Sequence, residues 1–272
     1  MSQKKILYFV SEDKYFLTHK LSHALVALEN GFSVLIVCKV TDFKKKILSY
    51  GFQVKNINLD RGSLNIVKEL KTLYELFKIL KAFQPDIIVN IALKPILYGL
   101  LCSKLFKKIN LKINAIVGLG YLFINKGPKI TILKVILKKV LFFLFKDTKV
   151  IVVFQNRDDR NYFLQKKIIT SCKQKIIEGS GVDVKYFKPS NIKKKYDLVM
   201  HSRMLRDKGV IDLIKAVKEL QKRNIFLKVL LLGNPDYKNL ASIKKNELEQ
   251  WNSEKIIKWI PEKQNILTYI QQ

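Results

Sequence analysis

The regular alternation of short apolar runs with amphipathic stretches constrains the fold of this chain more than any other feature. An apolar run at 6–10 is followed by an amphipathic stretch from Phe16 to Leu28 and by a second apolar run at 33–38. Strands that alternate with helices form a parallel sheet covered on both faces, so the sequence predicts an α/β fold. The same alternation continues with expected strands at 86–90, 112–117 and 149–154 and expected helices at 64–83, 96–106 and 157–164.

A break in this alternation divides the chain. Residues 184–195 contain Pro189 and three consecutive lysines, and the pattern then starts again at Tyr196. We therefore expect a first Rossmann-like domain at 1–183, a linker at 184–195 and a second Rossmann-like domain at 196–272. The second domain has expected strands at 196–201, 226–232 and 255–259 only. Open α/β sheets usually have about five or more strands, so we expect this domain to be incomplete in the chain.

The composition is that of a folding chain with a large positive charge. Of its 272 residues 48% are hydrophobic, and 51 Lys+Arg against 22 Asp+Glu give a formal net charge of +29. The hydrophobic share excludes a disordered tail. The charge favours nucleic acid or an anionic membrane surface as a partner, and a general compositional bias explains it equally well. No RNA-recognition signature or basic helix is evident, so nucleic acid is not expected.

Neither a metal nor a disulfide framework is expected. The three cysteines lie far apart and are odd in number, which favours a reducing cytoplasm. His19 and His23 are one helical turn apart, but no third ligand lies near them in sequence.

The segment from Lys129 to Lys146 combines many apolar residues with regularly placed lysines. Its lysines interrupt it too often for a membrane-spanning helix. A helix lying in the membrane interface and a core helix packed on the sheet are both compatible with the pattern.

Two cations five residues apart mark the start of the second domain. Arg203 falls in the loop after an expected strand, and Lys208 falls where an amphipathic helix begins. A helix N-terminus carries partial positive charge, so a lysine there favours a bound anion such as a diphosphate. A solvated loop is the alternative interpretation.

Six short stretches carry a family resemblance in the same order along nearly the whole chain. They are FVSED at 9–13 with His19, LKPILYG at 93–99, VGLGYLF at 117–123, QNRDD at 155–159, GVD at 181–183 and RMLRDKG at 203–209. Together they resemble retaining glycosyltransferases of the GT-B type, in the branch that acts on polyprenyl-diphosphate-linked sugars.

The resemblance implies sugar transfer, without cofactor or metal, from a nucleotide sugar (a UDP-sugar) to a lipid-linked saccharide in bacterial cell-surface polysaccharide or glycan synthesis. It implies a cytoplasmic protein associated peripherally with the inner face of the membrane. Arg203 and Lys208 match the residues that hold the donor diphosphate, and they would stabilise the charge on departing UDP. The remaining site residues expected are Gly209 and Gly233 on the donor side and His19, Lys94, Gly118 and Gly120 on the acceptor side.

Four of these residues also have a simpler interpretation. Gly233 fits an ordinary turn at a strand end, Lys94 fits a surface lysine, and Gly118 and Gly120 fit a structural turn. Relatives in this branch carry a later helix with two glutamates eight residues apart, which this chain lacks. We therefore expect a C-terminally truncated transferase with impaired activity, and the alternative is a non-catalytic remnant that binds acceptor or membrane. A UDP-sugar epimerase fits less well, because its acid and histidine constellation is not evident.

Overall fold

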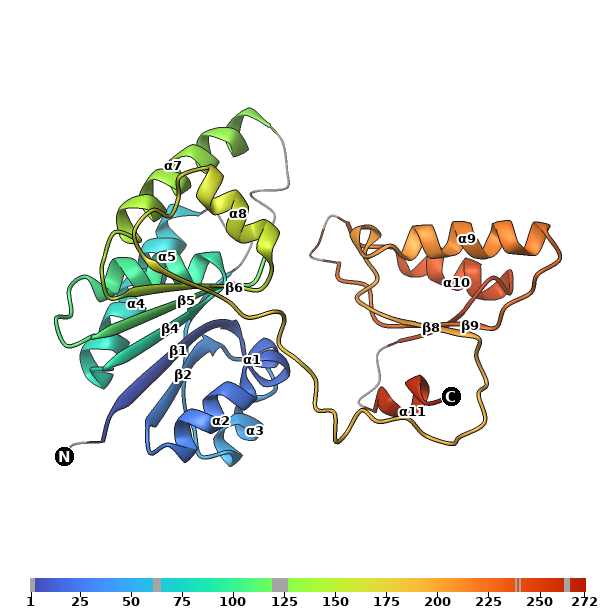
Figure 1. Ribbon diagram of the computed structural model, residues 1–272, viewed down its shortest axis with the longest axis horizontal. Coiled ribbons are helices and arrows are strands. Elements are labelled where there is room, and N and C mark those ends of the chain that lie inside the picture. The colour runs from blue at the N-terminus through green and yellow to red at the C-terminus, as the bar shows by residue number, and fades with distance from the viewer. Residues whose placement is uncertain (1–2, 61–64, 119–126, 238, 240, 262–264) are drawn as a thin grey trace. The chain divides into compact units, whose positions relative to one another are not determined.

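The computed structural model describes residues 3–60, 65–118, 127–237, 239, 241–261 and 265–272. The chain divides into two compact units, a first unit at Met1–Gly181 and a second unit at Val182–Gln272. Figure 1 labels their elements.

The first unit is built on a parallel sheet. Its seven described strands follow the order β3-β2-β1-β4-β5-β6-β7, and every neighbouring pair is parallel. This confirms the expected α/β class. The strands are β1 (Lys5–Glu12), β2 (Ser33–Lys39), β3 (Gln53–Asn56), β4 (Ile87–Ile91), β5 (Leu111–Ile116), β6 (Val150–Phe154) and β7 (Lys173–Ile176).

Helices cover both faces of this sheet (Figure 1). On one face, Tyr8 and Val10 of β1 pack with three helices, α1 (Asp13–His19), α2 (Leu21–Glu29) and α3 (Lys44–Ser49). On the other face, Leu7 and Phe9 pack with α4 and α5. Alternate residues of a strand point to opposite faces, so β1 contributes to both cores. The helices of the second face are α4 (Ile66–Phe83), α5 (Leu93–Ser103), α7 (Pro128–Leu144) and α8 (Arg157–Gln165).

The first helical region differs from the prediction. The apolar pattern from Phe16 to Leu28 predicted one helix, whereas the structure has α1 and α2 separated at Lys20, whose φ of −131° and ψ of −2° are not helical. Both helices bury apolar residues in the same core, so the pattern continues across the break. The pattern also gave no sign of α3, whose only buried residue is Ile47, or of β3, an edge strand whose residues are exposed or half-buried.

The second unit repeats the architecture on a smaller scale. Its described sheet has the order β10-β9-β8 with parallel pairing, and α9 and α10 cover one face (Figure 1). The last strand starts later than predicted because Lys255 adopts a left-handed φ of 57°, which ends the preceding helix. The elements are β8 (Leu198–His201), the 3₁₀ turn η1 (Arg206–Lys208), α9 (Val210–Lys222), β9 (Val229–Leu232), α10 (Lys245–Ser253), β10 (Lys258–Ile260) and α11 (Leu267–Ile270).

Candidate functional site

The carboxyl edge of the second sheet presents Arg203 to solvent. Arg203 follows β8, and its Nη1 lies 2.9 Å from Oδ2 of Asp236, which follows the neighbouring strand β9. The Met204 amide donates to the Asn234 carbonyl, so the loops after the two strands lie side by side. The Arg203 side chain is 56% exposed. Ligands of open α/β sheets bind at this edge, and the cation is accessible there.

Lys208 and Gly209 form the entry to α9. Lys208 is the last residue of η1 and is exposed, and it has no ion-pair partner among the described residues. Gly209 has φ +79°, a left-handed conformation that favours glycine and that lets the chain pass from η1 directly into α9. No described side chain caps α9. Its first N–H groups and Lys208 therefore form an open cationic helix end.

A second arginine of the same loop is engaged elsewhere. Arg206 Nη2 lies 2.8 Å and 3.1 Å from the two carboxylate oxygens of Glu247 in α10. The hydrogen bond from the Lys244 amide is the main cause that lowers the pKa of Glu247; burial opposes it, and Arg206 lowers the pKa further. The sequence gave no sign of this pair because its members are far apart along the chain. Both arginines of this loop are thus exposed and ion-paired, but Arg206 contacts two carboxylate oxygens whereas Arg203 contacts one.

Gly233 lies where β9 approaches the loop after β8. Its φ is +143°, and a Cβ atom there would lie 1.8 Å from the Ser202 carbonyl oxygen and 2.8 Å from Met204 Cε. Trp259 Nε1 also donates to the Gly233 carbonyl at 2.9 Å. The close backbone approach at this glycine is therefore made by the chain itself, as the turn interpretation expects.

Lys94 lies in the first turn of α5, just after β4. Its Nζ donates to Glu69 Oε1 at 2.8 Å and to the Asp60 carbonyl at 2.7 Å. The Tyr98 hydroxyl also donates to Glu69, and burial together with this hydrogen bond raises the pKa of Tyr98. Lys94 is thus at the expected sheet edge but already has a carboxylate partner.

His19 ends α1 and is exposed. Its ring stacks on Tyr15 at 4.4 Å, and Thr18 Oγ1 lies 2.6 Å from its Nδ1. Burial and then the charge of Lys20 lower the pKa of the nearby His23. Among the described residues, His, Cys, Asp and Glu form no group of three or more that could hold a metal ion.

Gly118 follows β5, with φ +132° and no described atom within 4 Å of the position of a Cβ atom. Gly120 lies outside the described residues. The described acceptor-side residues therefore follow three adjacent strands: His19 comes after β1, Lys94 after β4 and Gly118 after β5. The sheet order brings these residues to the same carboxyl edge.

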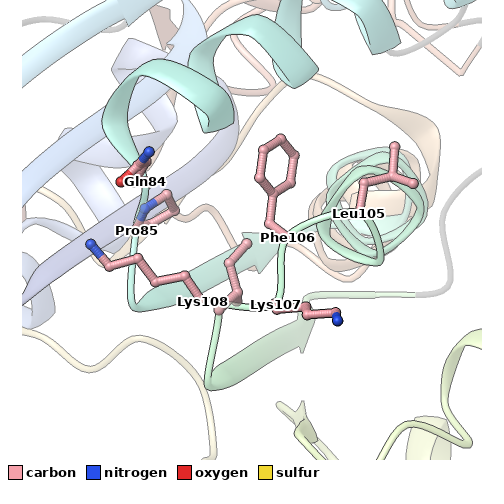
Figure 2. Close-up of a pocket in the computed structure, with 7 residues that line it drawn as sticks. Gln84, Pro85, Leu105, Phe106, Lys107 and Lys108 are labelled. Carbon is pink, nitrogen blue, oxygen red and sulfur yellow. The ribbon is translucent and has the colours of Figure 1, made fainter.

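A pocket of about 220 Å³ lies at the opposite edge of this sheet (Figure 2). Gln84 and Pro85 precede β4, and residues 105–109 precede β5. Parallel α/β sheets bind ligands at the carboxyl edge, so this pocket is separate from the candidate site.

Helix α7 has both an inner and an outer apolar face. Its inner residues Leu137, Leu141 and Leu144 are buried in the core. Lys138 lies over the Tyr162 ring of α8 at 5.3 Å, and Lys139 is exposed. No described helix is both long enough and apolar enough to cross a membrane. Four outer apolar side chains are 49% to 62% exposed, namely Ile132, Val135, Ile136 and Phe143.

Comparison with known proteins supplies the family. Residues 5–156 match the family model described as glycosyl transferase 4-like. No curated protein matched the sequence. Among solved structures, a glycosyltransferase from Rickettsia africae has a TM-score of 0.72 at 16% identity, covering 100% of this chain and 71% of that one. Sucrose-phosphate synthase from Thermosynechococcus elongatus has a TM-score of 0.70 at 14% identity, covering 99% and 73%.

A third solved structure is HepE of Anabaena in complex with UDP and glucose, with a TM-score of 0.69 at 17% identity, covering 98% of this chain and 72% of that one. These likenesses show the fold, that of GT-B glycosyltransferases. The family model matches more than half of the sequence. The chain therefore belongs to the glycosyl transferase 4-like family.

Proposed function

We propose that this glycosyltransferase moves a sugar from a UDP-sugar to a polyprenyl-diphosphate-linked saccharide, with retention at the anomeric carbon, in the synthesis of a bacterial cell-surface glycan. The observation that carries the donor assignment is the placement of exposed Arg203 and unpaired Lys208 at the carboxyl edge of the second sheet, beside the uncapped start of α9. HepE, a structural neighbour, holds UDP and glucose, which supports a nucleotide sugar as donor.

In the proposed reaction, the main contribution of these residues is to stabilise the leaving group, UDP. The bond between the sugar and the β-phosphate oxygen of UDP breaks, and a bond to an acceptor hydroxyl oxygen forms, while the hydroxyl proton passes to the released diphosphate. Negative charge grows on UDP as the first bond breaks. Arg203, Lys208 and the N-terminus of α9 would stabilise that charge more in the transition state than in the ground state.

The first unit would bind the acceptor through the residues that follow β1, β4 and β5. Lys94 can contact an acceptor phosphate only if it releases Glu69, because its ammonium already donates to that carboxylate. Gly118 is accessible without such an exchange. We therefore assign Lys94 a secondary contribution to acceptor binding.

We also propose that the protein works on the cytoplasmic membrane surface, with α7 as the contact. Its exposed apolar side chains lie on a helix that also carries lysines, and this combination suits an anionic lipid interface. The inner face of α7 is in the core, so the two interpretations of this helix are compatible.

Calorimetry with UDP tests the donor site. We expect Arg203→Ala or Lys208→Ala to weaken UDP binding by about 1.5–3 kcal/mol, the range of hydrogen bonds to charged groups. Arg206→Ala is the matched control, because Arg206 is held by Glu247 and should leave UDP affinity unchanged. Unchanged affinity in both test variants, or no UDP binding by the wild-type chain, contradicts the donor assignment.

An assay with a panel of UDP-sugars and a polyprenyl-diphosphate-sugar acceptor tests turnover. Product with the donor anomeric configuration supports the proposal, and product with the inverted configuration contradicts the retaining mechanism. Membrane or acceptor binding without product would favour the alternative of a non-catalytic binding protein.

Sedimentation with anionic liposomes tests the membrane contact. Replacing Ile132, Ile136 and Phe143 with serine should strongly reduce binding at low salt. The control replaces three exposed apolar side chains of α4, Ile66, Val67 and Leu70, which are 60% to 75% exposed, and should retain binding. Equal binding to neutral and anionic liposomes would exclude a contribution from the lysines.

A further inference from the structure

The junction between α1 and α2 contains a buried lysine. Lys20 is 9% exposed, and its ammonium has no hydrogen-bond or ion-pair partner among the described residues. Lysine is almost never fully buried unless it is paired, because removing its charge from water is unfavourable. A lysine whose stem is buried and whose ammonium has no described partner is a candidate to bind an anion.

The start of α2 independently lacks an acceptor. The backbone N–H groups of Leu21, Ser22 and His23 have no described acceptor, and no described side chain caps the helix. The first turn of this nine-residue helix contains no acidic residue. These N–H groups carry the partial positive charge of a helix N-terminus, and Ser22 and His23 are exposed.

The two features are adjacent in the chain and lie at the edge where ligands bind. α1 begins at the end of β1, and α2 leads back to the start of β2. There the Ser33 amide donates a hydrogen bond to the Lys4 carbonyl. The first turn of α2 therefore lies on the side of the carboxyl edge. Lys20 immediately precedes this first turn, and its charge adds to burial in lowering the pKa of His23 within it.

We propose that the α1–α2 junction is a phosphate site, in which Lys20 and the N–H groups of residues 21–23 hold a phosphate of the acceptor diphosphate. Phosphate oxygens accept hydrogen bonds from a helix N-terminus, and a lysine supplies a compact counter-charge. The identity of the occupant rests on the lipid-linked acceptor proposed above. Within the first unit this site suits an anion better than Lys94 does, because Lys94 already has Glu69.

The histidines provide the readout. The chain has three, of which His19 and His23 lie in the first unit and His201 ends β8 in the second. In an NMR titration with inorganic pyrophosphate, we expect the bound anion to raise the pKa of His23, because negative charge favours the imidazolium form. His201 reports separately on the donor side.

Substitutions at Lys20 test the site directly. Lys20→Met keeps the apolar stem and removes the charge, and we expect it to weaken pyrophosphate binding at His23 by about tenfold or more. Without ligand it should also raise the pKa of His23, since the charge of Lys20 lowers that pKa. Lys20→Arg should bind within about threefold of wild type. Lys45→Met removes an exposed lysine of α3 and should change nothing.

A soluble isoprenyl diphosphate distinguishes the source of the phosphate. Tighter binding of geranyl diphosphate than of pyrophosphate, lost in Lys20→Met, supports an acceptor site, and equal binding of the two contradicts the acceptor as occupant. A His23 signal that pyrophosphate leaves unchanged, or wild-type affinity in Lys20→Met, overturns the phosphate site. Arg203→Ala should not alter the His23 titration, so failure here is separable from failure of the donor assignment.

Discussion

The candidate phosphate-binding cations of the two units differ in exposure and in their ion-pair partners. In the first unit Lys94 and Glu69 are 21% and 19% exposed, and Lys94 also donates to a backbone carbonyl. In the second unit Arg203 and Asp236 are 56% and 33% exposed, and Lys208 has no described partner. An exposed ion pair contributes about 0–1 kcal/mol, so a diphosphate can displace Asp236 at little cost.

This difference separates a cation that helps to hold the fold from one that is available to a ligand. Lys94 joins α5 to Glu69 of α4, and Tyr98 donates to the same carboxylate. Arg203 joins only two loops at the edge of a small sheet. We therefore expect the partners already present, and not position at the carboxyl edge alone, to decide between the two roles.

The largest expected change in the free energy of unfolding concerns one of two glycines with positive φ, Gly233 in the second unit and Gly118 in the first. Gly233→Ala should lower the free energy of unfolding of the second unit by at least about 3 kcal/mol, because backbone strain adds to a clash with the Ser202 carbonyl. Both tryptophans, Trp251 and Trp259, lie in the second unit. Tryptophan fluorescence during urea denaturation therefore measures this unit separately.

Gly118→Ala is the matched control in the first unit. Its φ of +132° is similar, but no described atom lies within 4 Å of the added carbon. We expect a loss of only about 1–2 kcal/mol from strain, measured by circular dichroism. Equal losses in the two variants would show that strain, and not the contact with Ser202, makes glycine necessary at 233.

The next prediction compares one lowered carboxyl pKa in each unit. Burial raises the pKa of Asp147, but the hydrogen bond from Lys112 and that from the Lys149 amide outweigh it and hold the pKa below its usual value. The Lys112 side chain is only 5% exposed. Asp147→Asn leaves that buried ammonium without a counter-charge and should lower the free energy of unfolding by about 2–3 kcal/mol.

The pH dependence of this pair follows from the sign of the shift. A carboxyl with a lowered folded-state pKa contributes its stability above the unfolded value of about 4 and loses it as pH falls through the folded-state value. Denaturation midpoints measured from pH 6 to pH 2 should therefore converge for wild type and Asp147→Asn. Glu247→Gln, which affects a more exposed pair with Arg206, should cost less than about 1 kcal/mol at pH 6.

Local sequence pattern predicted the parallel α/β class because buried strands and amphipathic helices are encoded by residues close together in the chain. It also placed Arg203 correctly between a strand and a helix. It could not predict that Lys94 meets Glu69, since the two residues are 25 positions apart and meet only through the packing of α4 on α5. The break at Lys20 was missed for a related reason, because both helices bury their apolar residues in one core. The ligand-binding roles themselves remain proposals.

Small effects are expected from removing the carboxylate beside each candidate cation. Glu69→Gln keeps the shape of the side chain but removes the charge that neutralises Lys94, and we expect a loss of about 1–2 kcal/mol in the free energy of unfolding. Asp236→Asn should cost less than about 0.5 kcal/mol, because its pair with Arg203 is exposed.

If the partner decides the role of the cation, Glu69→Gln should also raise the pyrophosphate affinity of the first unit by about threefold, and Asp236→Asn should change UDP affinity by less than about twofold. Calorimetry on both variants measures these changes. A larger gain in UDP affinity for Asp236→Asn than in pyrophosphate affinity for Glu69→Gln would reverse the comparison, and would mean that Asp236 restrains Arg203 more strongly than Glu69 restrains Lys94.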